Sequence, residues 1–234
     1  MDTALAQRKY RLGLRWSAEV GRTFGLWALI ALAALQLAQI GFRLAIGFEG
    51  DYTYYLLRYA PFVLTAVGWV YLFKAFPRAI ATGMTRKELF VAFAVFSAVV
   101  IAGSVAFIEL VKLCHNLIGP GDLGRLDLGG AALLETLIRT AVYFSAGAAA
   151  GAVMARFNGR TLGAVLAGVV IGVLIFRPIP FQLLFTEFAQ GKVFEVEFPG
   201  SEELLAPMDA VLTVVFVLIV WLTLARAPMP HKKA

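Results

Sequence analysis

Glu135 and Arg139 lie four residues apart in the otherwise apolar stretch Ala131 to Ala155. Side chains at this spacing share one face of a helix, so the carboxylate and the guanidinium can form an ion pair. Ionisable groups in an apolar helix are energetically expensive, and by default they indicate a functional site. Both residues lie in the first half of the stretch, where a long arginine side chain can still reach a membrane surface. A purely structural ion pair therefore remains the alternative.

A second polar group lies in the first apolar stretch, Thr23 to Ile46. Gln36, Gln39 and Arg43 fall on one face of a helix there. We expect this face to lie at the same depth as Glu135. The hypothesis is that Arg43 or the glutamines approach Glu135 in an outer vestibule.

The groups that covalent or metal-assisted catalysis needs do not cluster in the sequence. Ser97, Ser104 and Ser145 lie in apolar stretches that contain no histidine to serve as a base. The chain has two histidines and one cysteine, and Cys114 and His115 are adjacent, as in a loop, rather than spaced for metal ligation. We therefore expect no metal site, no disulfide and no catalytic residues, and an intramembrane enzyme is the weaker alternative.

Composition explains why these polar residues are unusual. Of the 234 residues, 60% are hydrophobic and only 15% are charged, with a mean hydropathy of +0.80. Soluble domains carry about 25% charged residues. The chain is therefore predicted to be an all-α, polytopic membrane protein, with residues 1–234 forming a single transmembrane domain.

Six stretches are long and apolar enough, or nearly so, to cross a bilayer. They are Thr23–Ile46, Tyr59–Phe76, Leu89–Val111, Ala131–Ala155, Thr161–Phe176 and Asp209–Ala225. With the N-terminus in the cytoplasm, inner segments hold fourteen of the 21 lysines and arginines and outer segments hold six. This bias predicts that both termini are cytoplasmic. The basic balance suits an anionic membrane surface, and no aromatic-basic patch suggests a nucleic-acid partner.

The residues before the first span are predicted to form a basic interfacial helix, residues 1–22. Its charged residues recur every three or four positions and so form one stripe: Arg8, Arg11, Arg15, Glu19 and Arg22. Such a helix lies in the plane of the membrane surface. Simple anchoring to lipid is the alternative to a role in binding a partner.

The connection between the second and third spans carries the signals of a short, separately terminated helix. Pro77 suits a first helical position, and Gly83 suits a left-handed helix end. Thr85 and Glu88 have the spacing of a capping box that starts the next span. The alternative is an ordinary tight loop with basic flanks.

The outer connection, residues 177–207, is too long for a simple turn and follows a span of about 16 residues. Pro178 and Pro180 end that span, and the residues from Phe181 to Phe188 are apolar. Ser201 is a plausible start for the final helix. We expect a re-entrant helical hairpin here, and an external amphipathic lid is the alternative. Two glycine pairs, Gly147 with Gly151 and Gly168 with Gly172, are predicted to mark helix contacts.

This order of parts resembles the ABC transporter type-2 permease family. The stretch from Arg78 to Phe90 is similar to the segment that many bacterial members carry there: a small-residue helix, then Gly, a hydrophobic residue, Ser or Thr, and Arg. The resemblance covers nearly the whole chain in topology but only these residues in sequence. It implies a permease subunit of the bacterial inner membrane that works as a dimer, with the same or a different second permease.

In this family two cytoplasmic ATPase subunits drive transport and dock on the connection between spans two and three, the coupling helix. This chain has no Walker-type phosphate loop, so ATP and Mg would bind the separate ATPase subunits. The resemblance assigns the coupling role to residues of the 77–88 connection: Arg78, Thr82, Gly83, Met84, Thr85, Arg86, Lys87 and Glu88. The interfacial helix would brace the ATPase, and Phe181, Phe185 and Phe188 would form an external gate.

The substrate stays unidentified, and the lack of an outer receptor domain favours export. The alternatives are an ion-coupled secondary transporter, for which internal repeats would be expected, and an accessory membrane subunit.

Overall fold

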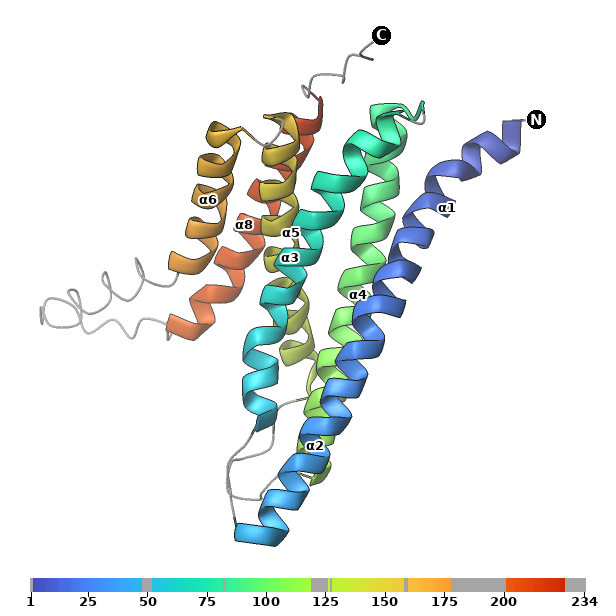
Figure 1. Cartoon of the computed structure of the whole chain (residues 1–234). Helices are drawn as coiled ribbons and strands as arrows, with labels where there is room; N and C mark the ends of the chain where they lie inside the picture. The colour runs from blue at the N-terminus through green and yellow to red at the C-terminus, as the bar shows by residue number, and fades with distance from the viewer. Residues whose placement is uncertain are drawn as a thin grey trace, which may run out of the picture. The chain divides into compact units, whose positions relative to one another are not determined.

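The computed structural model describes residues 2–47, 52–81, 83–118, 126, 128–157, 160–177 and 201–225. These residues form helices and no strand, which confirms the expected all-α class. The helices, shown in Figure 1, are α1 (Asp2–Val20), the π-helical segment η1 (Gly21–Gly25), α2 (Leu26–Ile46), α3 (Tyr52–Ala81), α4 (Arg86–Ile118), α5 (Gly130–Arg156), α6 (Thr161–Phe176) and α8 (Ser201–Ala225).

Five helical stretches in the described part of the chain are long and apolar enough to cross a membrane: Gln7–Ile46, Ala60–Ala81, Arg86–Leu117, Gly130–Arg156 and Leu205–Ala225. This pattern is that of a multi-pass integral membrane protein. The remaining expected span, Thr161–Phe176, matches α6, whose 16 residues extend about 24 Å at 1.5 Å per residue. Helix α6 is therefore shorter than the usual thickness of the hydrocarbon layer, about 30 Å.

The chain forms two compact units. The first unit comprises Met1–Leu64 and Lys87–Thr140, and the second comprises Thr65–Arg86 and Ala141–Ala234. Helices α3 and α5 each contribute their first part to the first unit and their last part to the second. Helix α4 belongs to the first unit except for its first residue, Arg86.

In the first unit, α1, η1 and α2 form one continuous helical rod that runs beside α4 (Figure 1). Gly13 allows the close approach, because a Cβ there would lie 2.5 Å from the carbonyl oxygen of Ala92. One turn later the rings of Trp16 and Phe96 meet edge to face at 6.1 Å. Ser17 is buried and donates its hydroxyl to the Gly13 carbonyl.

The expected break between an in-plane helix and the first span is absent from this rod. The backbone stays helical on both sides of η1, with φ of −61° at Val20 and −64° at Gly25. Small residues let α1 pack along α4, and this contact favours a continuous rod over a separate surface helix. The charged stripe lies on the side of α1 turned away from this contact, where Arg8, Arg11 and Arg15 are exposed.

In the second unit, glycines bring α3 and α5 into backbone contact. A Cβ at Gly68 would lie 2.5 Å from the Phe144 carbonyl oxygen, and one at Gly151 would lie 2.6 Å from the Trp69 carbonyl oxygen. Gly147 faces the Thr65 backbone more closely still. The prediction of a contact face at Gly147 and Gly151 is therefore confirmed. In contrast, Gly168 and Gly172 have no described atom within 4 Å of such a Cβ.

Two sequence predictions about element boundaries are wrong. Helix α3 continues through Pro77 to Ala81, so residues 77–81 do not form a separate short helix. Phe76 and Ala79, on either side of the proline, are buried, and this packing offsets the one helix hydrogen bond that proline removes. Cys114 and His115, expected in a loop, lie in the last turns of α4, where His115 is buried.

Candidate functional site

The turn between α3 and α4 has a defined backbone structure. Gly83 has a φ of +80°, as predicted, and its N–H donates to the Ile80 carbonyl at 3.0 Å. The Met84 N–H donates to the Ala79 carbonyl at 3.2 Å. This pair of bonds is a Schellman motif, in which a left-handed residue reverses the chain and satisfies the last helix carbonyls. Helix α4 then begins at Arg86, directly after Thr85.

Arg86 joins this turn to the last helix. Its Nη1 donates a hydrogen bond to the carbonyl of Ala225, the final residue of α8. A cation at a helix C-terminus also interacts favourably with the helix dipole. Arg86, which the family resemblance assigns to ATPase contact, therefore also ties the turn to the end of α8 within the second unit.

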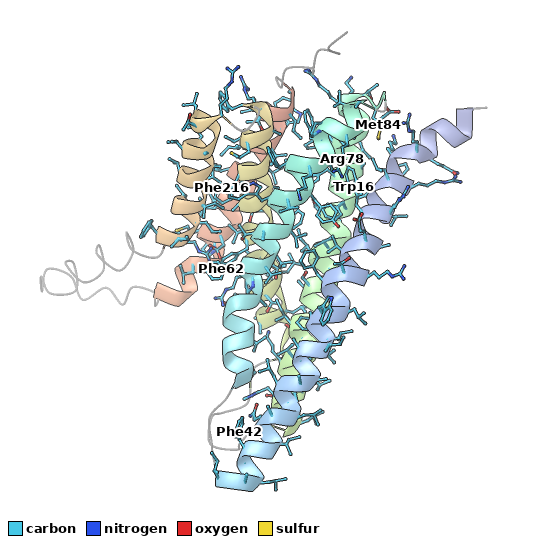
Figure 2. The ribbon with its side chains drawn as sticks, viewed as in Figure 1. Trp16, Phe42, Phe62, Arg78, Met84 and Phe216 are labelled. Carbon is cyan, nitrogen blue, oxygen red and sulfur yellow. The ribbon has the colours of Figure 1, made fainter. Side chains whose placement is uncertain are left out.

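The side chains of the turn divide into buried and exposed groups. Met84 is buried beneath the turn, whereas Arg78 on the last turn of α3 is exposed (Figure 2). Gly83, Thr85 and Lys87 are also exposed, and Glu88 is half-buried. Thr82 lies outside the described residues. The turn thus presents cations on a fixed backbone.

A second polar site lies inside the second unit, between α6 and α8. Nε of Arg177, the residue after α6, lies 3.0 Å from Oδ1 of Asp209 on α8. The guanidinium also stacks on the ring of Tyr143 on α5, with Cζ 4.9 Å from the ring centroid. Only 10% of the Arg177 side chain and 4% of the Asp209 side chain are exposed.

The ion pair lies at the far end of two apolar helical stretches. Arg177 follows α6, sixteen residues after Thr161, and Asp209 precedes Ala225 by the same number. Tyr143 lies thirteen residues from each end of α5. At 1.5 Å per residue the pair lies about 20–24 Å from the helix ends at Arg156, Thr161 and Ala225.

Sequence reasoning missed this ion pair. It assigned Arg177 to an external connection and Asp209 to the first residue of a span. Helix α8 begins at Ser201, the start that the sequence suggested, so Asp209 lies two turns inside the helix. The available signal was an ionisable residue next to each of two unusually short apolar stretches: Arg177 directly follows the first stretch, and Asp209 begins the second.

The predicted Glu135–Arg139 ion pair is confirmed, with Arg139 Nη2 2.7 Å from Glu135 Oε1. Both side chains are about half exposed, in the first unit. Gln36 and Gln39 are buried, and Arg139 is the partner that the described residues provide for Glu135. The proposed approach of Arg43 or the glutamines to Glu135 stays a prediction.

A related polar contact joins α4 and α5 in the first unit. Lys112 Nζ lies 2.7 Å from Glu109 Oε1 and 3.0 Å from the Thr136 hydroxyl. This lysine is largely buried and contacts two polar partners, which is typical of a structural contact. The predicted gate residues Phe181, Phe185 and Phe188 lie outside the described residues.

No protein-family model, no curated protein and no solved structure matches this chain. The function must therefore be argued from the two sites themselves: the basic turn between α3 and α4, and the buried ion pair of Arg177 and Asp209.

Proposed function

We propose that this protein is the membrane-spanning permease subunit of an ATP-driven exporter, with ATP hydrolysed on a separate cytoplasmic subunit. The proposal includes six spans, with α6 as the short fifth, and both termini in the cytoplasm. It also includes a second permease, the same chain or another. The basic turn between α3 and α4 is the observation that carries the proposal.

Three properties of the turn suit it to receive force from a partner. The Schellman motif fixes its backbone, so an applied displacement moves the end of α3 rather than being absorbed by a flexible loop. The Arg86 bond to Ala225 adds α8 to the part that moves. Exposed Arg78 and Lys87 supply charge that steers and orients an acidic partner surface.

Helix α3 then connects the turn with the buried ion pair in the second unit. The Thr65 hydroxyl donates to the Tyr143 carbonyl at 3.0 Å, and the glycine contacts at Gly68 and Gly151 hold α3 against α5. A shift of α3 therefore acts on Tyr143, whose ring covers Arg177. Rigid-body motion of this kind is the basis of alternating access.

The direct test is ATP-driven activity with an ATPase subunit encoded beside this chain. Both chains would be co-expressed, purified in detergent and reconstituted, and ATP hydrolysis would be measured with and without the permease. Reversing the two exposed cations, Arg78→Glu with Lys87→Glu, should lower the stimulated rate at least about tenfold by weakening docking. The matched control is Arg139→Glu, also an exposed charge reversal.

An unchanged rate in the double variant, or an equal loss in the Arg139 control, would reject the turn as the docking site. Stable association with no stimulation by the wild-type permease would reject the ATP-driven function itself.

An ion-coupled carrier is the second candidate, because a buried ion pair within spans is common on proton and ion paths. Proteoliposome uptake that follows an imposed proton gradient without ATP, and is lost in Asp209→Asn, would favour this candidate.

A further inference from the structure

We propose that Arg177 is the binding residue for the phosphate or carboxylate head of an amphiphilic anion that this protein carries. The inference deepens the proposed function, on which it rests, by assigning a substrate class. Asp209 is the counter-ion that neutralises the arginine while no substrate is bound.

The first argument is the hydrogen-bonding capacity of Arg177. A guanidinium has five N–H donors in a planar fork. The 3.0 Å contact of Nε with Asp209 Oδ1 is an ion pair without an aligned hydrogen bond, and Nη1 is fully buried with no hydrogen-bond acceptor among the described residues. A charged donor left unsatisfied in an apolar interior is energetically unfavourable. An anion that accepts from Nη1 would remove this cost.

The second argument is the orientation of the guanidinium. The guanidinium lies over the Tyr143 ring, with Cζ 4.9 Å from the ring centroid, and Nε lies beside Asp209. These two contacts leave Nη1 to donate to an anion, and a guanidinium recognises carboxylate and phosphate oxygens bidentately. A lysine could supply the charge but not this fork.

The third argument is the apolar character of the surrounding helices. Val173 and Phe176 on α6 and Val211 on α8 are exposed apolar residues within one to two turns of the ion pair along their helices. An anion that approaches along these helices passes exposed apolar side chains, which an apolar body would contact favourably. This favours an amphiphile over a small hydrophilic anion.

Nη1 has no solvent access in the described structure, so an anion reaches it only after a local rearrangement. The bound anion would then lie beside the Asp209 carboxylate, whose like charge opposes binding. Removing the Asp209 charge should therefore strengthen anion binding, whereas removing both charges should abolish it without leaving a buried uncompensated charge.

The test measures binding of dodecyl phosphate to the purified full-length protein in an uncharged detergent, by isothermal titration. Inorganic phosphate tests a soluble anion, and dodecanol tests the apolar chain without charge. The variants are Asp209→Asn, Arg177→Lys, and the double variant Arg177→Gln with Asp209→Asn, which stays neutral and so should fold. Arg139→Gln is the matched control at an exposed ion pair.

We expect wild-type and Arg139→Gln protein to bind dodecyl phosphate with the same affinity, and Asp209→Asn to bind about tenfold more tightly. Arg177→Lys should bind at least about tenfold more weakly, and the double variant should not bind. Equal binding by the double variant and wild type, or equal binding of dodecanol, would overturn the proposal. Tight binding of inorganic phosphate would show that the site takes a soluble anion, and it would overturn the assignment of an amphiphilic substrate.

No ATPase subunit is present in this assay. If the double variant loses binding but the reconstituted wild type shows no ATP-dependent transport, the ATP-driven function alone is rejected. If ATP-dependent activity is found but the double variant still binds dodecyl phosphate as the wild type does, this anion site alone is rejected.

Discussion

Gly151→Ala offers a quantitative test of the contact between α3 and α5. The added Cβ would lie 2.6 Å from the Trp69 carbonyl oxygen and 3.1 Å from its Cα, whereas ordinary contacts begin near 3.4 Å. The two helices must therefore separate locally by about 0.8 Å, the difference between these distances. Because the obstructing atoms belong to the backbone, no side-chain rotation relieves the clash.

The energetic cost follows from this displacement. A gap of 0.5–1 Å forfeits about a quarter to a half of each dispersion contact across it, and overpacked sites typically lose about 1–3 kcal/mol. Alanine gains up to about 1 kcal/mol over glycine in a helix interior. The expected net loss is about 1–2 kcal/mol.

Gly168→Ala is the matched control on α6. No described atom lies within 4 Å of a Cβ at this position, so the substitution should gain up to about 1 kcal/mol from helix propensity alone. The two variants should differ by about 2–3 kcal/mol. For a chain of this size that difference corresponds to roughly 5–10 °C in Tm.

The assay is thermal unfolding of the purified protein in one detergent, followed by tryptophan fluorescence with both variants measured beside the wild type. Equal Tm values for Gly151→Ala and Gly168→Ala would refute the close approach of α3 and α5. A lower Tm for Gly168→Ala alone would instead place an unrecognised contact on α6.

Three further predictions use the same unfolding assay or simple proteolysis. Arg177→Gln should lower the free energy of unfolding by about 3–5 kcal/mol because it leaves the buried Asp209 carboxylate without its counter-ion, whereas Arg139→Gln at the exposed pair should lower it by less than about 1 kcal/mol. Equal losses would contradict the burial of the Arg177–Asp209 pair. Gly83→Ala should cost about 1–2 kcal/mol through its left-handed backbone, and Gly83→Asn less, an order that a different turn conformation would reverse. Gly13→Leu should detach α1 from α4 and expose α1 to limited proteolysis, and unchanged protection would reject that packing.

The lengths of the apolar runs and the helix-end residues predicted a helix boundary correctly where the sequence around that boundary determines it. Thr161 and Phe176 bound α6 as expected, and Gly83 adopts the expected positive φ. In both places the determining physics is local: the limits of an apolar run, or a residue that tolerates a left-handed backbone.

The predictions failed where packing overrides a local signal. Pro77 favours a helix start, but the buried neighbours Phe76 and Ala79 keep α3 continuous through it. The basic stripe before Thr23 favours a surface helix, but contact of Gly13 with α4 keeps the rod straight through η1. Propensity is a weak guide when tertiary contacts oppose it.

The Arg177–Asp209 pair shows a different limit. The two residues are 32 positions apart, so no helical period relates them, and each taken alone resembles a charge at the end of a span. Their positions correspond along the two helices, because Arg177 lies sixteen residues after Thr161, the first residue of α6, and Asp209 lies sixteen residues before Ala225, the last residue of α8. A comparison of the positions of charged residues along two neighbouring spans would have found this pair. Spacing within a single span could not.

The two candidate sites belong to one mechanical element. The second unit contains α3 from Thr65 to the turn, the Arg86 bond to α8, and the ion pair that joins Arg177 to α8. Helix α8 is therefore held at Ala225 by the turn and at Asp209 by Arg177, sixteen residues apart. Under the proposed function, a partner that displaces the turn would act on α8 through Arg86, and α8 would connect that movement with the proposed anion site at Arg177.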